Sequence, residues 1–382
     1  MSFEIIRKKI TLDQSSPTTF SFSGTVKSSI YGLTSFELNS DEDVLDYKEI
    51  EISLVSNPQN QNILITASAN IEGLSKSESY VVVTVLAWIE TASNGLLFTS
   101  STGAKEMQQV NAQHSVSEPP LVNVSLLQGF DLAFDSGKSR SSGLGVSTGA
   151  FDSPFEQQGS RTPAMVSTTL FGGGKSSQPG TSKTDVGMIT FSEAQTAVDV
   201  RLINSAKAGP LDTNSSTQVN DSENPVTSFA LFINTFSMAT AQGALYLNRI
   251  KVGAENISSN VYVPNTVINW SSHATAYNPE YGSNREQTAG SLTMLYIGLL
   301  GPVVNELSST SGPAQGGNVI TISGRNLTNY TGVTFGGTPA THISQHDESL
   351  KVTVPEGKAG SVEVVVTTPY GEGSSSTKYT YN

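Results

Sequence analysis

Apolar and polar residues alternate with a period of two in short runs along most of the 382-residue chain. Other runs, such as Val81–Leu86 and Leu292–Ile297, are almost wholly apolar, and stretches rich in Gly, Ser and Asn separate them. Alternation is typical of a half-buried strand, and no long segment shows the 3.6-residue period of a helix. The pattern predicts an all-β protein made of antiparallel β-sandwiches.

One apolar pattern occurs three times in the first 300 residues. Each copy has a phenylalanine followed fourteen positions later by the first residue of an apolar pair. The three matches are Phe36 with Ile50, Phe130 with Leu144, and Phe236 with Ile250. We therefore predict tandem β-sandwich repeats over residues 1–110, 111–210 and 211–301. The alternative is that these are chance matches in a β-rich sequence, and this alternative carries most weight for the middle copy. There the Ser- and Gly-rich stretch 135–184 predicts long exposed loops.

The last eighty or so residues carry a different pattern. They contain the runs GPVVNELSSTSGPAQGGNVITISGRNL, VTFGGTPATHI and LKVTVPEGKAGSVEVVVTTPYG. Gly312-Pro313, Gly316-Gly317 and Gly336-Gly337 mark turns between alternating strands. This order resembles the IPT/TIG family of immunoglobulin-like domains. The resemblance implies a small β-sandwich over residues 302–382 that serves as a spacer, an adhesion module or a carbohydrate-associated appendage, without an active site.

The first repeat has a resemblance of its own. A Phe-x-Leu strand at Phe36 precedes an acidic turn (residues 41–46), an alternating strand (residues 47–52) and a closing strand that ends at Trp88. This order is similar to the H-type lectin domain, a six-stranded sandwich that forms trimers or hexamers and binds sugars such as N-acetylgalactosamine at subunit boundaries. The resemblance implies that three tandem copies fold as a pseudo-trimer within one chain.

Charge and composition narrow the classes of partner. The net charge is −12 and no basic patch occurs, which argues against nucleic acid and anionic membranes as partners. The chain has no cysteine, so disulfides and thiolate sites are excluded. The N-terminal segment shows no signal-peptide pattern, and no apolar run is long enough to span a membrane. We expect a protein that is made in the cytoplasm and acts extracellularly or on the surface of a particle.

No motif predicts catalysis, a metal or a cofactor. The four histidines do not cluster, and the acidic turn lacks the spacing and the glycine of a calcium loop. Gly172-Gly-Gly174-Lys175-Ser176 lacks the first glycine of a phosphate loop, and no G-x-S-x-G occurs. Because paired carboxylates come from distant strands, a glycosidase is kept as a distant alternative.

The candidate binding residues are aromatic. Trp270, His273, Tyr277 and Tyr281 lie in a polar, aromatic stretch before the last strand of the third repeat. Sugar rings stack on flat aromatic faces while polar side chains bind their hydroxyls, so these residues are candidates for glycan contact. The alternative is that Trp270 and Tyr281 pack against a neighbouring repeat or subunit, as Trp88 is expected to pack in the core.

The sequence therefore favours a non-catalytic, lectin-like protein that recognises a glycan or a cell-surface polysaccharide and associates with itself. The alternative is a structural or receptor-binding component of a phage tail or an injection-type particle, for which the weakly charged surface is typical. Both roles suit a repeated β body that carries an immunoglobulin-like domain.

Overall fold

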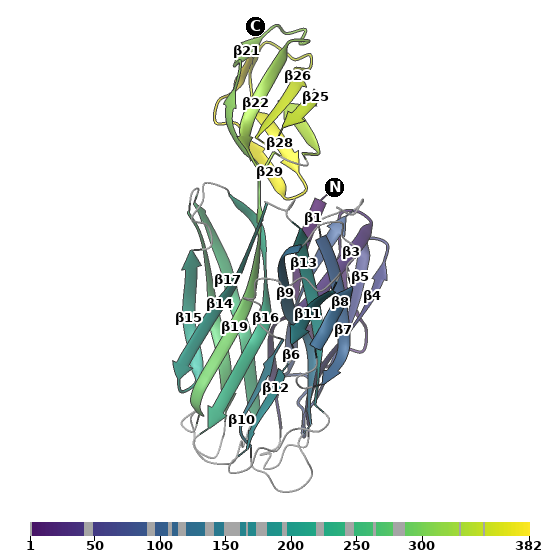
Figure 1. Ribbon diagram of the computed structural model, residues 1–382, viewed down its shortest axis with the longest axis vertical. Helices are drawn as coiled ribbons and strands as arrows, with labels where there is room; N and C mark the ends of the chain where they lie inside the picture. The colour runs from purple at the N-terminus through teal and green to yellow at the C-terminus, as the bar shows by residue number, and fades with distance from the viewer. Residues whose placement is uncertain are drawn as a thin grey trace.

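The computed structural model describes residues 2–41, 49–89, 96–105, 109–113, 120–133, 141–148, 161–165, 167–172, 182–192, 197–218, 225–240, 248–262, 265–277, 287–327, 330–346 and 348–382. Within these residues the regular elements are strands, with no helix, which confirms the predicted all-β class. No apolar helix of membrane-spanning length is found in this part of the chain. The strands of the body run along the long axis of the molecule (Figure 1).

The alternation seen in the sequence gives the strands their buried faces. In β4, for example, Ile50, Ile52 and Leu54 are buried, whereas Glu49 and Glu51 on the other face are partly exposed. Successive side chains of a strand point to opposite faces, so this order requires one apolar neighbour and one solvated side.

Residues 2–300 form three units with equivalent strand orders. The first unit contains β1 (Ser2–Thr11), β2 (Thr18–Ser21), β3 (Val26–Asn39), β4 (Glu49–Gln59), β5 (Asn62–Asn70) and β6 (Tyr80–Ile89). The second contains β7 (Leu96–Lys105), β8 (Gln109–Gln113), β9 (Pro120–Ala133), β10 (Ser141–Ser147), β11 (Arg161–Met165), β12 (Ser167–Gly172) and β13 (Lys183–Ser192). The third contains β14 (Val198–Ala208), β15 (Leu211–Gln218), β16 (Val226–Thr240), β17 (Arg249–Tyr262), β18 (Asn265–Tyr277) and β19 (Gln287–Leu300).

The units are joined because each large sheet combines strands from two of them. The strand orders are β1-β6-β3-β17-β18-β15, β7-β13-β9-β4-β5-β2 and β14-β19-β16-β10-β12. In each of these three sheets, the strand of one unit that carries the repeated phenylalanine pairs with the strand of another unit that carries the apolar pair of the repeat. The exchange is cyclic, from unit 1 to unit 3, from unit 3 to unit 2 and from unit 2 to unit 1.

This pairing brings the repeated residues into equivalent register. Across the three boundaries the antiparallel partners are Phe36 and Val252, Phe130 and Ile52, and Phe236 and Val146. The three phenylalanine rings meet in the centre of the body, with centroids 5.6, 5.7 and 5.6 Å apart. The fourteen-residue spacing therefore reflects a true repeat, and the middle copy is included in it.

The structure corrects the predicted organisation of the repeats in two respects. First, β7 pairs with β13, and β14 pairs with β19, so the second and third units begin near residues 96 and 198 rather than at 111 and 211. Second, one hydrophobic cluster extends through all three units. They therefore share a core and do not form separate sandwiches.

A ring of buried hydrogen bonds lies beside the phenylalanines. At equivalent positions of the three units, a polar side chain donates to a main-chain carbonyl oxygen of another unit. The bonds are Thr34 Oγ1 to Leu231 O (2.7 Å), Gln128 Nε2 to Tyr31 O (3.0 Å) and Asn234 Nδ2 to Ser125 O (2.9 Å). The three donor residues are at most 1% exposed. Because an unpaired buried polar group is costly, these bonds fix how the units meet.

Side-chain size is also complementary at the centre. Gly32, Leu126 and Phe232 occupy equivalent positions, and a Cβ on Gly32 would lie 2.5 Å from Leu126 Cδ1 and 3.0 Å from Phe232 Cδ1. A large, a medium and an absent side chain thus fill one space. Identical subunits do not have this option, since each would place the same residue there.

The remaining residues form a C-terminal domain with its own core, which contains Phe335, Tyr379 and Tyr381. Its strands are β20 (Val303–Leu307), β21 (Ser311–Gly312), β22 (Val319–Arg325), β23 (Gly332–Phe335), β24 (Thr338–Pro339), β25 (Thr341–His346), β26 (Ser349–Thr353), β27 (Gly360–Val362), β28 (Val364–Thr368), β29 (Gly371–Ser374) and β30 (Tyr379–Tyr381). They form sheets in the orders β20-β22-β26-β25, β21-β30-β27 and β24-β23-β28-β29.

The C-terminal domain is docked on the end of the body where the chain begins (Figure 1). Tyr370 belongs to the C-terminal domain, but its side chain packs in the core of the body, where its ring centroid lies 6.4 Å from that of Trp88. The Phe3 amide donates to Pro369 O at 2.9 Å, and the Thr227 hydroxyl donates to Tyr370 O. A buried aromatic side chain and main-chain hydrogen bonds therefore hold the two parts together.

Candidate functional site

Three of the four aromatic and histidine candidates lie on β18, and Trp270 is in the core. Its side chain is 3% exposed, and its Nε1 donates to Ser272 Oγ at 2.7 Å. The stretch is a strand rather than the polar loop that was expected, and Ile268, Trp270 and Ala274 form its buried face. Trp270 therefore packs, and it offers no flat face to a ligand.

His273 is also buried, and it belongs to a network of charges. Its Nδ1 lies 3.2 Å from Asp212 Oδ1, and its Nε2 lies 3.9 Å from Glu255 Oε2. Burial and the nearby Lys251 lower the pKa of His273. Tyr277 ends β18, and Tyr281 falls outside the described residues. Trp270 and His273, the two candidates whose side chains the structure describes, are thus both buried.

A cluster of charged side chains joins units 1 and 3 at the centre of their shared sheet. The Tyr80 hydroxyl lies 3.0 Å from Glu37 Oε2 and also contacts Glu255. Lys251 Nζ is 2.7 Å from Glu255 Oε2 and 3.6 Å from Glu37 Oε2, and Arg249 Nε is 2.8 Å from Glu37 Oε1. Every one of these charges is met by a protein group of opposite sign.

The electrostatics of this cluster indicate a structural role. Burial opposes ionisation of Glu37, but Arg249, Tyr80 and Lys251 outweigh it, so the pKa of Glu37 is lowered. The pKa of Glu255 is lowered in the same way, with burial outweighed by Lys251 and Tyr80. A general acid needs a raised pKa, so this pair of carboxylates does not fit the two roles of a glycosidase.

A groove opens where β17 leaves its neighbour. The pairing of β3 with β17 runs from Arg249 to Gly253 and stops there, while β17 continues to Tyr262. Gly253 has φ of 112°, and a Cβ on it would lie 2.3 Å from Thr34 O, so only glycine fits this crossing. Beyond it the strands of units 1 and 3 separate, and we call the space between them the inter-unit groove.

Two cavities that share Arg7 form the inter-unit groove. The lower cavity, of about 330 Å³, is lined by Arg7, Lys8, Lys9, Tyr80, Val82, Ala254, Glu255, Asn256 and Ile257. The upper cavity, of about 390 Å³, is lined by Ile5, Arg7, Thr84, Val226, Thr227, Ser228, Phe229, Ser259 and Thr266. Their lining comes from β1 and β6 of unit 1 and from β16, β17 and β18 of unit 3.

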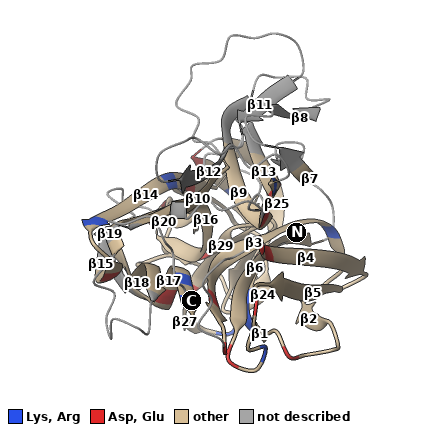
Figure 2. Cartoon of the chain, turned by 90° about the horizontal axis from the view of Figure 1, so that it is seen from below, with Lys and Arg blue, Asp and Glu red and all other residues tan. Residues whose placement is uncertain are grey.

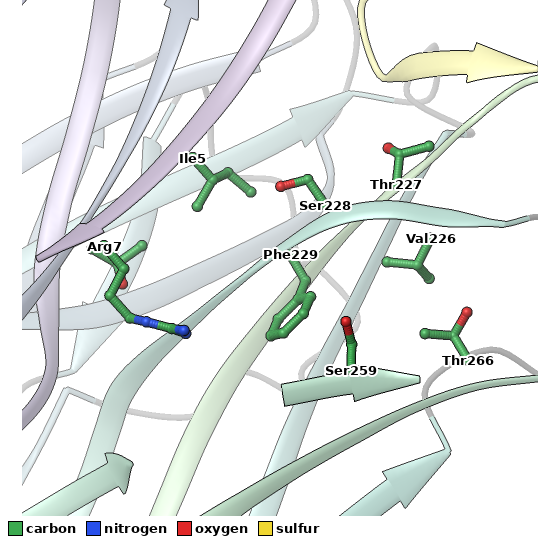
Figure 3. Close-up of a pocket in the computed structure, with 9 residues that line it drawn as sticks. Ile5, Arg7, Val226, Thr227, Ser228, Phe229, Ser259 and Thr266 are labelled. Carbon is green, nitrogen blue, oxygen red and sulfur yellow. The ribbon is translucent and has the colours of Figure 1, made fainter. Parts of the chain in front are cut away.

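The upper cavity combines a cation, an aromatic ring and hydroxyl groups (Figure 3). Arg7 extends from β1 toward the side of the cavity that carries Phe229, and Ser228 and Ser259 supply hydroxyls. Phe229 is half-buried, and its ring lies 6.2 Å from that of Tyr296. A site of this kind orients a small polar ligand through few groups.

Thr266 has the most informative side chain of the upper cavity. It is 1% exposed, and its Oγ1 is buried without a hydrogen-bond partner in the described structure. Buried hydroxyls nearly always have a partner in the protein, in ordered water or in a ligand. Thr266 is one of the residues that line the cavity, so this unsatisfied hydroxyl lies at or just behind the cavity wall.

Sequence reasoning missed this site because its residues are far apart in the chain. Arg7, Phe229 and Thr266 each stand in a run that reads as an ordinary strand. The one available signal was the run Arg7-Lys8-Lys9 in a chain of net charge −12. Only the departure of β17 from β3 shows that this run faces a cavity.

The family comparison concerns the docked C-terminal domain. Residues 302–381 match the model of the IPT/TIG domain family. These residues form an IPT/TIG domain. This result confirms the predicted family and the border at residue 302. The TIG domain is the part of the molecule that contributes Tyr370 to the core of the body.

Other comparisons give partial overlaps. No curated protein matches the chain. An auxiliary nutrient-binding protein from Bacteroides ovatus is 32% identical over 22% of this chain and 21% of its own, with a TM-score of 0.19. One from Bacteroides thetaiotaomicron is 21% identical over the same shares, with a TM-score of 0.18. The extracellular region of plexin A4 is 10% identical over 99% of this chain and 48% of its own, with a TM-score of 0.21.

The overlaps leave the function of the whole protein open. The aligned part spans about a fifth of the length of the nutrient-binding proteins. The resemblance of the first unit to H-type lectins stays a prediction, as do carbohydrate binding and self-association. The arrangement of the body therefore has to support any proposal.

Proposed function

We propose that this chain is a non-catalytic recognition protein that binds a glycan in the inter-unit groove. The observation that carries the proposal is the upper cavity, in which the buried Thr266 hydroxyl has no partner among the described residues, and Arg7 and Phe229 line the same space. Sugars offer hydroxyl groups for such partners and apolar ring faces for an aromatic side chain.

The position of the groove adds support. It lies at a boundary between two units of a pseudo-trimer, and the resemblance to H-type lectins implies sugar binding at subunit boundaries. The volume of about 390 Å³ lies at the lower end of the range for small-ligand sites and suits one or two sugar residues. We propose a protein of the cell exterior or a particle surface, with the TIG domain as its attached module.

The test is a glycan and polysaccharide array with the intact chain and with a variant that blocks the cavity. Ser259 is exposed and lines the upper cavity, so Ser259→Tyr fills it. Ser258→Tyr is the matched control, because the neighbouring residue is also exposed and does not line this cavity. We expect binding by the wild type and the control, and its loss in Ser259→Tyr.

The alternative is a structural component of a phage tail or an injection-type particle. A structural subunit assembles into rings or filaments that electron microscopy reveals, and it shows no binding on the array. An array without any bound glycan, together with such assemblies, would replace the proposal by this alternative. Equal binding by Ser259→Tyr and the control would place the glycan site elsewhere.

A further inference from the structure

We propose that the upper cavity selects a saccharide with a single negative charge, of the uronic-acid type, and that the chain holds one such site. The inference rests on the proposed glycan function and names its ligand class. It depends on Arg7, on the fixed positions of the neighbouring cations and on the divergence of the three units.

Of the three cations Arg7, Lys8 and Lys9, Arg7 is the one whose charge is available to a ligand. Lys8 Nζ donates to Thr19 O at 2.7 Å and lies 5.6 Å from the centroid of the Phe20 ring. Lys9 Nζ lies 3.4 Å from the centroid of the Tyr80 ring. Arg7 makes no ion pair with an acid in the part of the chain that the structure describes.

The described acids near the groove already have protein partners. Glu255, which lines the lower cavity, is bound by Lys251 and Tyr80. Glu4, on the same strand as Arg7, accepts hydrogen bonds from the amide and hydroxyl of Ser23. The described residues that line the upper cavity include the guanidinium of Arg7 and no carboxylate, so no acid among them competes with a bound anion.

The chemistry of the cavity favours a carboxylate on a sugar. A guanidinium donates two parallel hydrogen bonds to a carboxylate, and hydroxyls such as that of Thr266 donate to the remaining lone pairs. Among the described residues that line the upper cavity, Arg7 is the one cation, and one positive charge matches one negative charge better than the two of a phosphate. Phe229 offers an apolar face for the sugar ring. A sulfate ester is also singly charged, and the experiment separates the two groups.

The site occurs at one of three equivalent boundaries. The positions equivalent to Arg7 in the other units follow from the strand pairing. In unit 1, Arg7 is the partner of Thr84 on the next strand, and Thr84 is the partner of Gly32 on the strand after that. The corresponding series are Ser100, Gly187 and Leu126 in unit 2, and Leu202, Leu295 and Phe232 in unit 3. Serine and leucine carry no charge, so one site per chain is expected.

The experiment is isothermal titration calorimetry of the full chain with three oligosaccharides of equal length. One is a galacturonate that carries a single galacturonic acid residue in an otherwise neutral galactose chain, the second is the corresponding neutral oligogalactose, and the third carries one sulfate ester in place of the carboxylate. We expect the galacturonate to bind most tightly, with one site per chain. The variant Arg7→Gln should bind it about 10- to 100-fold more weakly, the loss typical of a charge-assisted hydrogen bond. Lys76→Gln removes an exposed charge elsewhere and should change nothing.

The outcomes separate this inference from the proposed function. If the neutral sugar binds as tightly as the galacturonate, or if Arg7→Gln binds unchanged, the charge selectivity is wrong and glycan binding stands. If the sulfated sugar binds most tightly, the carboxylate assignment is overturned. Three sites per chain would refute the single site. If none of the sugars binds the folded chain and the glycan array is also empty, the proposed function fails together with the inference.

Discussion

Replacing Phe130 by alanine should destabilise all three units of the body at once. The residue lies in unit 2 and is 3% exposed, and its ring contacts those of Phe36 and Phe236 at 5.6 Å each. Truncation of a buried phenylalanine costs about 3–5 kcal/mol, and the loss of two aromatic pairs places the expected value at the upper end of that range. Because the core is shared, this cost falls on the whole body.

The two tryptophans make the prediction measurable. Trp88 lies in unit 1 and Trp270 in unit 3, so the fluorescence excited at 295 nm reports on the two units that the substitution does not touch. In urea, the tryptophan transition of Phe130→Ala should move to a lower midpoint, by the amount that corresponds to this loss of unfolding free energy. Circular dichroism should show the same midpoint.

The control uses the core of the TIG domain, which contains no tryptophan. Phe335 is 1% exposed and packs against Tyr379, so Phe335→Ala removes a comparable side chain. It should move the tryptophan midpoint far less than Phe130→Ala. If Phe130→Ala instead leaves that midpoint unchanged while unit 2 becomes sensitive to protease, the units fold independently and the shared-core reasoning is wrong.

Three further predictions follow from other contacts. Asn234→Ala removes a buried donor to Ser125 O and should lower the free energy of unfolding by about 1–3 kcal/mol in a denaturation curve. Tyr370→Ala should release the TIG domain from the body, seen as a shift of Trp88 emission to longer wavelength and faster proteolysis between the two parts. Burial and two nearby glutamates raise the pKa of Asp131 to about 6. The folded state then binds this proton more tightly than the unfolded state, so the contribution of Asp131 to stability should be lost as pH rises from about 4 to 6, and Asp131→Asn should remove that contribution from the pH profile.

The fold was predictable where the pattern is local. The spacing from Phe36 to Ile50 predicted the repeat because both residues sit on the core faces of strands, and the turns of residues 302–382 predicted the TIG domain. The borders at 110 and 210 were less accurate, because the first strand of each unit is assigned by its pairing with a strand some eighty residues or more later. Pairing over such distances leaves no mark on the local sequence.

The candidate site was not predictable in the same way. Trp270 attracted attention as an aromatic residue among polar neighbours, yet Ile268 and Ala274 already placed it on an alternating apolar face. Arg7 and Thr266 line one cavity because β17 separates from β3 after Gly253. The groove is therefore a product of strand geometry, and the run Arg7-Lys8-Lys9 was its one trace in the sequence.

The contact between Thr227 and Tyr370 has a geometrical consequence. Thr227 lines the upper cavity, and its hydroxyl is bound to the main chain of the TIG domain. A homotrimer would carry three such domains, with nothing to distinguish one boundary from the next. Here a single domain contacts one boundary of a body whose three units pair in equivalent register. Any anchor that holds the TIG domain therefore also fixes the direction in which the inter-unit groove faces.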